Sequence, residues 1–249
     1  MAIRIVSPYR PFAPESRSHL ELGVFDWVGA LEMLQSSVHR VMPTCEAVAI
    51  TDVDTRLPVA SLAFQTTERR LMLWILEVSL RYLESDSFDR DTVMLSPDTL
   101  VLKDLSYWFD DVFDLAILVR LEDKFQDGGG QVLNQVQFWR YVAKAGLIRF
   151  YRRALEIAHT LSEEWITWGA DTEPIRQLIE PIQGGIYKRQ DLFVSMICAS
   201  SVLESLTSTQ MKRMEAGAPL ITSRAVLDFR SSRKRSMRMA YEALSGVPA

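Results

Sequence analysis

The first 120 residues alternate between short apolar runs and longer segments whose apolar residues recur at helical spacing. Helical spacing covers residues 24–41 and about 67–85, and the second segment carries one stripe, made of Leu71, Trp74, Ile75, Val78 and Tyr82. The short runs predict strands at residues 3–8, 45–54, 92–102 and 113–120, with a short helix starting at 104–109. This alternation favours an α/β fold with a mainly parallel sheet covered by helices on both faces.

The pattern is less regular after residue 120. Residues 121–134 are rich in glycine and predict a loop, and residues 137–161 predict one or two helices. A further helix is expected after Asp171 or Thr172, either of which fits an N-cap, because Pro174 fits a first turn. The remaining elements are a hairpin, a strand, and a helix that follows a basic turn; they are predicted at residues 183–200, 223–229 and about 234–244.

The composition agrees with one substantial core. The chain has 249 residues, of which 48% are hydrophobic and 24% are charged. The N-terminal segment lacks the apolar stretch of a secretory signal, and no later run reaches the roughly 18 apolar residues that a membrane-spanning helix needs. Cys45 and Cys198 have no metal-type spacing, so we expect a cytoplasmic protein with two buried thiols.

Charge is distributed unevenly along the chain. Residues 211–249 hold eight Lys and Arg against three Asp and Glu, or +5, which leaves −9 for the rest of a chain with net charge −4. Such a basic run is usually a solvated face, and it is also the kind of segment that binds phosphate groups.

Candidate chemistry comes from carboxylates at strand ends. Asp52 and Asp54 end one predicted strand, and Asp98 ends another. Ligands of open α/β sheets bind outside the carboxyl ends of the strands, and carboxylates with substrate phosphates suit Mg²⁺ or Mn²⁺. The alternative is that Asp98 only caps a turn. The glycines at 128–130 match neither a phosphate loop nor a dinucleotide fingerprint.

The segment "DTVMLSPDTLVLKDLSYWFD" at residues 91–110 resembles the strand, metal motif and short helix of GT-A fold glycosyltransferases. The likeness is greatest to the glycogenin-like and bacterial lipopolysaccharide galactosyltransferase-like retaining families. Three more segments follow the order of that family: "IRIVSPY" its first strand, "WGADTEPIRQLI" its Trp-Gly-Asp-Gln helix start, and "AVLDFRSSRKRSMRMAYEAL" its C-terminal turn and helix.

The resemblance implies a GT-A-like single domain over residues 1–249, with a nucleotide-binding half at 1–120 and an acceptor half at 121–249. It implies transfer of a sugar from a nucleotide diphosphate donor, with UDP-sugar favoured, to a saccharide or other small acceptor. The expected cofactor is Mn²⁺ or Mg²⁺, and the expected outcome is retention of configuration. The oligomeric state is left open.

Two positions depart from the family motifs. Ser96 stands where the first carboxylate of the metal motif is expected, and Asp228 replaces the C-terminal histidine. The resemblance therefore implies a cation held by Asp98 and Asp228, completed by the diphosphate and water. In the competing interpretation the metal is lost, and cationic side chains neutralise the diphosphate directly; these are Arg230, Arg233, Lys234 or Arg235.

Other roles are also implied by position in the family. Asp171 would lie near the sugar and acceptor, where it is the catalytic candidate. The donor's nucleotide and diphosphate would contact Ser7, Tyr9, Arg10, Asp52, Arg70 and Ser96. The donor sugar would lie near Gln126, Asp127 and Asn134. The tryptophans are expected to pack in the core or between helices, and Trp168, beside Gly169 in a loop, is the one to test as a sugar platform.

Three alternatives stay open. Ser96 favours a non-catalytic protein that binds sugar nucleotides. A nucleotidyltransferase that makes sugar nucleotides shares a similar sheet, but the loop after residue 6, "SPYRPFAPES", lacks the glycines that such enzymes carry. The basic C-terminal segment is compatible with a glycosyltransferase whose acceptor is a modified nucleic-acid base, which would bind with a steep salt dependence.

Overall fold

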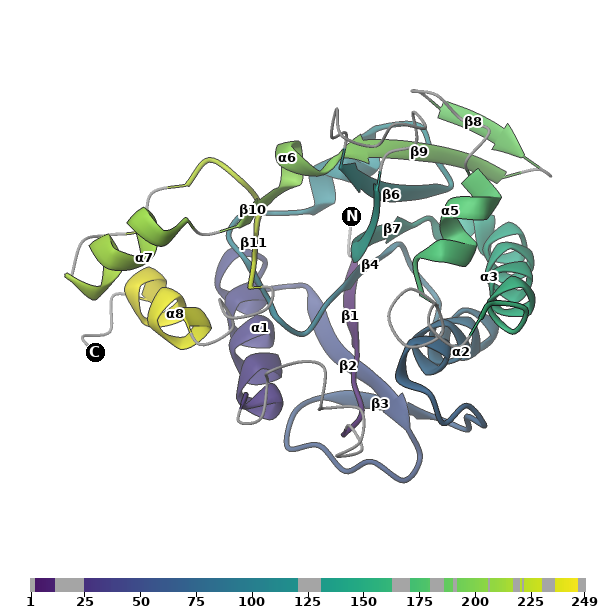
Figure 1. The fold of residues 1–249 in the computed structure, drawn as a ribbon, viewed down its shortest axis with the longest axis horizontal. Coiled ribbons are helices and arrows are strands. Elements are labelled where there is room, and N and C mark those ends of the chain that lie inside the picture. The colour runs from purple at the N-terminus through teal and green to yellow at the C-terminus, as the bar shows by residue number, and fades with distance from the viewer. Residues whose placement is uncertain are drawn as a thin grey trace.

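In the computed structural model, an eight-stranded sheet runs through the middle of the molecule (Figure 1). Its strands are, in spatial order, β3 (Ser61–Phe64), β2 (Glu46–Asp52), β1 (Arg4–Pro8), β4 (Thr92–Leu95), β7 (Gln131–Trp139), β6 (Leu115–Arg120), β9 (Leu192–Cys198) and β8 (Ile186–Arg189). Strands β7 and β8 run against the others, so the sheet is mainly parallel, as predicted. The structure describes residues 3–11, 25–120, 131–162, 171–179, 186–189, 192–205, 207–216, 220, 222–229 and 236–245.

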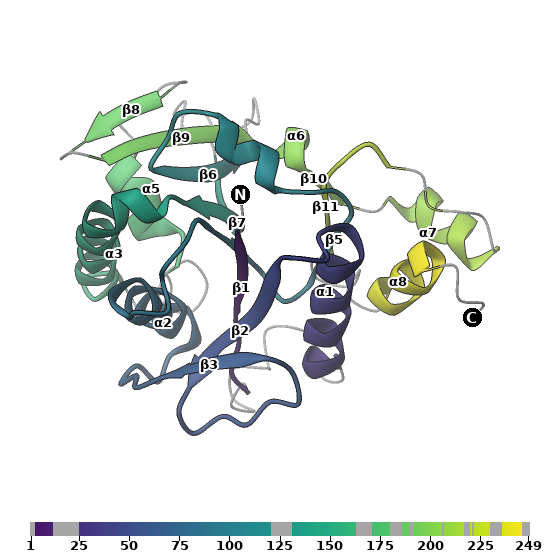
Figure 2. The ribbon, with the colours of Figure 1, turned by 180° about the vertical axis from the view of Figure 1, so that it is seen from behind.

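Helices cover both faces of this sheet (Figures 1 and 2). One face packs against α2 (Leu71–Glu84), α3 (Lys144–Ala158) and α5 (Glu173–Ile179). The other packs against α1 (Trp27–Val41), α6 (Ala199–Val202) and the 3₁₀ helix η2 (Ser106–Asp110). The side chains of β6 alternate between the two cores, because successive residues of a strand point to opposite faces. The predicted fold class is confirmed.

A small sheet extends the α1 side of the molecule. It contains β10 (Leu203–Ser205), β11 (Val226–Asp228) and β5 (Thr99–Val101), in that order. Beyond it lie α7 (Ser208–Glu215) and α8 (Met237–Ser245), which form a third apolar cluster with α1 (Figure 1). The chain therefore brings residues near its C-terminal end beside the segment that follows β4.

The strand predicted at residues 92–102 is wrong as a single element. It divides into β4, in the central sheet, and β5, in the small sheet, with a turn between them at Pro97 and Asp98. Proline has no amide hydrogen to donate to a strand ladder, which explains why pairing stops here.

Most other predictions for the first 120 residues are confirmed, with trimmed ends. Helix α1 begins at Trp27 because the side chain of Asp26 accepts a hydrogen bond from the amide of Gly29 at 2.8 Å, which caps the helix. The pattern did not predict β3, a half-exposed strand of four residues at the edge of the sheet.

The prediction of a loop up to residue 134 and a helix from residue 137 is wrong. The described part of this region begins with β7, and the helical part starts later, with η3 (Tyr141–Ala143) and α3. Strand β7 lies between β4 and β6, and its apolar side chains enter the cores on both faces of the sheet. Its sequence therefore lacks the alternation of a half-exposed strand. The β8–β9 hairpin, β11, α5 and α8 agree with the prediction.

The two cysteines differ from the prediction of two buried thiols. Cys45 is buried, and burial raises the pKa of its thiol to about 11, whereas Cys198 is exposed at the end of β9. None of the helices in the described ranges combines the length and the hydropathy that crossing a bilayer requires.

Candidate functional site

A pocket opens at the carboxyl ends of β1 and β4. These neighbouring strands mark the place where the strand order reverses, since β2 and β3 lie on one side of β1 and β4 lies on the other. In open α/β sheets such a switch point is the usual place for a ligand. The pocket is lined by Pro8, Tyr9, Arg10, Trp27, Leu71, Met72, Ile75, Met94, Ser96, Pro97, Asp98, Asn134, Gln135 and Asp171.

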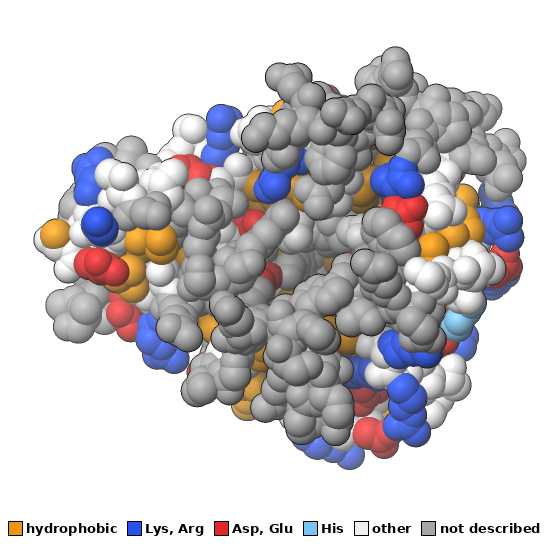
Figure 3. All heavy atoms as spheres, in the orientation of Figure 1, with side chains coloured by type: hydrophobic (Ala, Val, Ile, Leu, Met, Phe, Trp, Pro, Cys, Tyr) orange, Lys and Arg blue, Asp and Glu red, His pale blue; other side chains and the backbone are white. Residues whose placement is uncertain are grey.

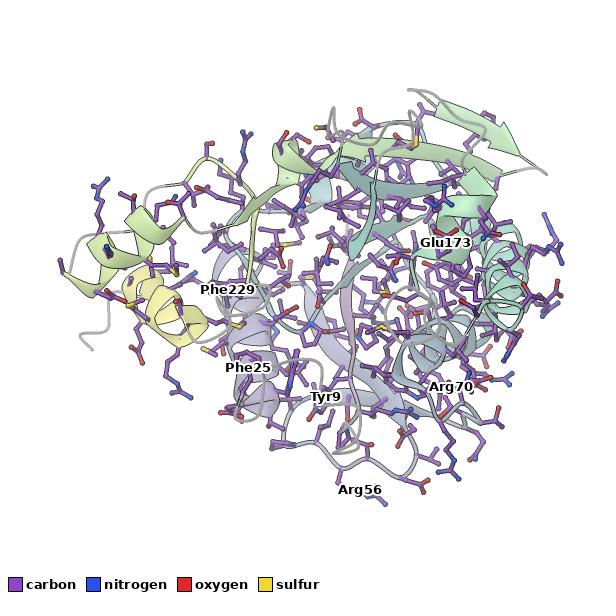
Figure 4. All side chains as sticks on the ribbon, in the orientation of Figure 1. Tyr9, Phe25, Arg56, Arg70, Glu173 and Phe229 are labelled. Atoms are coloured by element: carbon purple, nitrogen blue, oxygen red, sulfur yellow. The ribbon has the colours of Figure 1, made fainter. Side chains whose placement is uncertain are left out.

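The β1 side of the pocket carries Tyr9 and Arg10. Tyr9 is buried at the end of the strand (Figure 4). The guanidinium of Arg10 lies 5.0 Å from the ring centroid of Trp74 and donates to the backbone carbonyl groups of Glu68, at 2.7 Å, and Arg69. Burial lowers the pKa of Arg10, against the opposing charge of Asp52. Arg10 is thus a pocket cation whose orientation is fixed by the segment before α2.

That segment is in turn held by α2. The buried carboxylate of Glu77 accepts hydrogen bonds from the amides of Thr67 and Glu68, at 2.9 and 2.8 Å, and the indole of Trp74 donates to Thr66 at 3.2 Å. The first turns of α2 also supply Leu71, Met72 and Ile75 to the pocket. One helix therefore positions both a cation and an apolar wall.

The β4 side of the pocket is the turn that contains Ser96 and Asp98. The Ser96 hydroxyl donates to Oδ1 of Asp98, and the Ser96 amide donates to the carbonyl of Gln135 at 2.9 Å. Thr99 closes the turn by donating to the carbonyl of Ser96 at 2.7 Å. Asp98 is only 5% exposed, so its carboxylate is fixed against the pocket wall rather than solvated. Asp98 thus belongs to a hydrogen-bonded turn, as the alternative role of a turn cap would require, and it also lines the pocket.

The backbone segments that carry Asp98 and Asp228 lie side by side. Strand β11 pairs antiparallel with β5, with Asp228 opposite Thr99, and the amide of Phe229 donates to the carbonyl of Asp98 at 3.0 Å. Asp228 is 1% exposed and is absent from the residues that line the pocket in the described chain. Two buried carboxylates on adjoining segments are a donor set that fits a hard divalent cation. In the described ranges no three His, Cys, Asp or Glu side chains gather as a metal site, so further ligands would have to come from a substrate or water.

A β-bulge brings Asn134 into the pocket. The register of β6 and β7 changes between Ile117 and Leu118, which pair with Gln137 and Leu133, so three residues of β7 bulge out of this ladder. Two of them, Asn134 and Gln135, line the pocket. Bulges of this kind redirect side chains and are common beside active sites.

Asp171 closes the pocket from the start of α5. Asn134 Nδ2 donates to both the backbone carbonyl and Oδ2 of Asp171, each at 3.2 Å. Although the residue as a whole keeps some exposure, burial raises the pKa of its carboxyl group from an ordinary 3.8 to about 6, against the hydrogen bonds from Asn134 and the backbone amides of Asp171 and Thr172. A strongly perturbed carboxyl group in a cleft is a candidate functional group.

Three other predicted residues of the described chain, Ser7, Asp52 and Arg70, do not line this pocket. Ser7 is buried within β1, and Asp52 accepts a hydrogen bond from Thr55 at 2.8 Å at the end of β2. Arg70 is exposed and immediately precedes α2 (Figure 4). Several predicted residues fall outside the described residues: Gln126, Asp127, Trp168, Arg230, Arg233, Lys234 and Arg235. On the face in Figure 3, the described Lys and Arg side chains are scattered over the surface rather than gathered in one patch.

Sequence reasoning missed several pocket residues. Trp27, Gln135 and Met94 had no motif to mark them, and the apolar stripe that includes Leu71 and Ile75 was interpreted as core. The usable signal was position, because Trp27 opens a helix and Leu71 follows the arginine pair at residues 69–70.

Comparisons with known proteins address the fold. No protein-family model matches the chain. A sequence search of curated proteins finds no match either. Among solved structures, the chain is similar to a glycosyltransferase involved in the glycosylation of the major capsid of PBCV-1, with a TM-score of 0.57 and 10% identity over 96% of this chain and 100% of that one.

A second similar structure is the glycosyltransferase GlyE of Streptococcus pneumoniae TIGR4, with a TM-score of 0.55 and 11% identity over 98% of this chain. The chain spans 59% of the length of that protein. At these identities the likeness concerns the fold alone. The chain has the fold of these glycosyltransferases, and its pocket lies where that fold, as an open α/β sheet, is expected to bind ligands.

Proposed function

We propose that the protein is a glycosyltransferase that moves a sugar from a nucleotide diphosphate sugar to an acceptor. The observation that carries this proposal is the pocket at the switch point of the sheet, which combines Arg10, Asp98, Asn134 and Asp171 in a chain with a glycosyltransferase fold. The fold supports the proposal only by analogy with other glycosyltransferases, whereas the residues of the pocket supply the chemical argument.

The donor would enter with its nucleotide toward β1 and its sugar toward Asn134 and Asp171. Cleavage of the bond between sugar and phosphate develops negative charge on the phosphate and positive charge on the sugar. Arg10 would offset the first charge. The carboxylate of Asp171 would stabilise the second, and its hydrogen bond with Asn134 supports this role because it orients the carboxylate. Because the pKa of Asp171 is about 6, we expect activity to fall as the pH drops below that value.

A divalent cation fits this proposal. Asp98 and Asp228 would hold Mn²⁺ or Mg²⁺ with the diphosphate, as the pairing of β5 and β11 supports. When bound, the cation would stabilise the charge of the departing diphosphate. Hexose specificity, UDP as the nucleotide, and retention of configuration are finer parts of the proposal and rest on the family resemblance.

The test is incubation of the purified chain with UDP-, GDP- and dTDP-sugars, with and without Mn²⁺, while release of the nucleoside diphosphate is measured. We expect turnover with one donor class, and a loss of about 10²-fold or more in Asp98→Asn. Asp86→Asn is the matched control, since Asp86 is an exposed aspartate in the turn after α2. Full activity in Asp98→Asn would contradict the assigned site.

The cation has its own test in Asp228→Asn. If Asp228 is a ligand, this variant should need a higher Mn²⁺ concentration for half-maximal turnover, while its apparent KM for the donor at saturating Mn²⁺ changes less. Full activity with unchanged Mn²⁺ dependence would show that Asp98 and Asp228 do not share a cation.

A non-catalytic sugar-nucleotide-binding protein is the second candidate. The observation that favours it is the hydrogen bond from Ser96 to Asp98, which occupies one oxygen of the carboxylate that remains in the metal motif. Donor binding in calorimetry without turnover, over a panel of saccharide and nucleic-acid acceptors, would favour this candidate over the enzyme.

A further inference from the structure

A buried chain of hydrogen bonds connects the apolar core with the pocket. Gln137 lies in β7, between β4 and β6, and has no exposed surface. Its Oε1 accepts a hydrogen bond from the indole Nε1 of Trp139 at 3.1 Å and another from the hydroxyl of Tyr151 on α3. Its Nε2 donates to Oδ1 of Asn134, and Asn134 Nδ2 donates to Asp171.

The direction of this chain is determined by its inner end. An amide side chain can usually be turned round, because its oxygen and nitrogen are similar in size. The indole of Trp139 can only donate, so it requires the oxygen of Gln137. The nitrogen of Gln137 must then face Asn134. Asn134 accepts this hydrogen bond with its side-chain oxygen, so its NH₂ group is directed toward Asp171.

Tyr151 supports the same direction. Its side chain is 1% exposed, and burial raises its pKa, so the hydroxyl keeps its proton and can donate to Gln137. Its contribution is redundant, because the indole of Trp139, which can only donate, already requires the oxygen of Gln137, whereas a hydroxyl could also accept. Removing Tyr151's hydroxyl therefore leaves the direction of the chain unchanged.

We propose that Gln137 is a positioning residue for the proposed glycosyl transfer: anchored by Trp139, it holds the amide of Asn134 so that its NH₂ group faces the carboxylate of Asp171. This inference rests on the proposed function and adds a residue that lies outside the pocket. With the Asn134 amide reversed, a carbonyl oxygen would face the carboxylate of Asp171. Asp171 would then lose a donor and meet a second acceptor.

The cost of burying Gln137 supports this role. An amide side chain without exposed surface is unfavourable unless its donor and acceptor are both satisfied, and a methionine of similar length would fill the same space without that requirement. The chain of hydrogen bonds satisfies the amide and ends at the pocket, beside the carboxyl group with the strongly raised pKa.

Other titratable groups of the described chain line the same pocket as Asp171 or follow it on α5. Tyr9, Arg10 and Asp98 line the same pocket. On α5, Glu173 and Arg176 form a close pair at 2.7 Å. None of these side chains bonds to Gln137 among the hydrogen bonds described above, so a variant at position 137 reaches Asp171 through Asn134.

The experiment compares Gln137→Met with Tyr151→Phe. Both remove buried hydrogen bonds from the same place, but only the first releases the Asn134 amide. The titration of Asp171 is followed by carboxyl ¹³C NMR, with Asp171→Asn used to assign its signal. Turnover of the donor is measured in parallel.

In Gln137→Met we expect the titration midpoint of Asp171 to move to higher pH by about half a pH unit or more, because a hydrogen bond to the ionised form is weakened. We also expect kcat to fall about tenfold while the donor KM changes less than about threefold. In Tyr151→Phe the titration midpoint of Asp171 should move by much less than half a pH unit, and kcat and the donor KM should stay within about twofold of the values of the starting protein.

An unchanged Asp171 titration in folded Gln137→Met would overturn the proposal, and so would equal effects of the two variants. If Gln137→Met does not fold, a triple variant with Trp139→Phe and Tyr151→Phe also removes the two buried donors that lose their acceptor. The same shift of the Asp171 titration and the same fall in kcat are then expected of the triple variant. The NMR measurement needs no substrate. If no donor is turned over, the proposed function fails, while the titration still decides whether Gln137 orients Asn134.

Discussion

The two ends of the central sheet carry charged groups that are organised differently. At the amino ends of the parallel strands, acids and bases are matched: Arg4 pairs with Glu46 at 2.7 Å and with Asp89 at 3.1 Å, and Arg140 pairs with Asp91 at 3.2 Å. At the carboxyl ends lie Asp98 and Asp171, and Arg10 is the cation among the described pocket-lining residues.

The cations at the two ends also have different partners. Arg4 and Arg140 bind carboxylates of neighbouring strand ends and tie those strands together. Both also donate to backbone carbonyl groups, whereas the hydrogen bonds described above for Arg10 go to neutral backbone carbonyl groups alone, and Arg10 faces a pocket. Matched charges stabilise the fold, whereas carboxyl groups gathered in a pocket, one of them with a strongly raised pKa, are candidates for a functional site.

The largest effect is expected at the matched end, in Asp91→Ala. Asp91 is 3% exposed and accepts from Arg140 and, at 2.7 Å, from the amide of Tyr141, so its removal leaves both donors without this acceptor. We expect a loss of about 3 kcal/mol in the free energy of unfolding, measured in urea. Donor turnover per folded molecule should be unchanged, and the exposed Asp110→Ala should change neither quantity. Loss of turnover in folded Asp91→Ala would break the comparison.

A smaller loss of stability is expected in Arg4→Met. Arg4 is 6% exposed and also donates to the carbonyl of Ser87, but its partners Glu46 and Asp89 are well exposed and can be solvated when it is removed. Methionine keeps the apolar part of the side chain. We therefore expect about 2 kcal/mol in urea unfolding, without a change in the pH dependence of turnover. A shifted pH profile would connect this end to the pocket.

At the pocket end, Asp171→Asn should stabilise the protein while removing its activity. The folded state raises the pKa of Asp171 from 3.8 to about 6, so folding favours the protonated form and stability declines as the pH rises from about 4 to 6. At pH 8 we expect Asp171→Asn to gain about 1 to 2 kcal/mol, and at pH 4 to gain nothing. Thermal unfolding at the two pH values measures this. An equal change at both would mean that ionisation of Asp171 is not the cause.

Much of this fold could be predicted from the sequence because its strands and helices differ clearly in period. The strands at residues 3–8 and 113–120 and the helix with the Trp74 stripe were predicted within a few residues. Strand β7 was missed because it is buried on both faces, and the division of residues 92–102 was missed because apolar residues continue on both sides of Pro97.

The site was predictable only in part. Tyr9, Arg10, Ser96, Asp98, Asn134 and Asp171 were predicted and line one pocket. Family position placed them, since no local pattern relates Asp98 to Asp171. Gln137 could not be predicted in this way. Its role depends on a bulge in β7 and on the indole of Trp139 as a donor, and no sequence pattern indicates either.

The smallest effect is expected from substitution of Ser96, which lies beside Asp98 at the pocket end of the sheet. Ser96→Asp restores the first carboxylate of the metal motif and replaces the hydroxyl that donates to Asp98 with an acceptor. If Asp98 binds a cation, the Mn²⁺ concentration for half-maximal donor turnover should fall by about tenfold, or about 1.4 kcal/mol, because one carboxylate ligand is added. Without Mn²⁺ the same variant should be less stable than the starting protein, since two buried carboxylates then repel each other. Ser96→Ala, which removes the hydroxyl without adding charge, separates the two contributions. An unchanged Mn²⁺ requirement in Ser96→Asp would remove the cation from this end of the sheet, and Arg10 would then be the described pocket cation that faces the diphosphate.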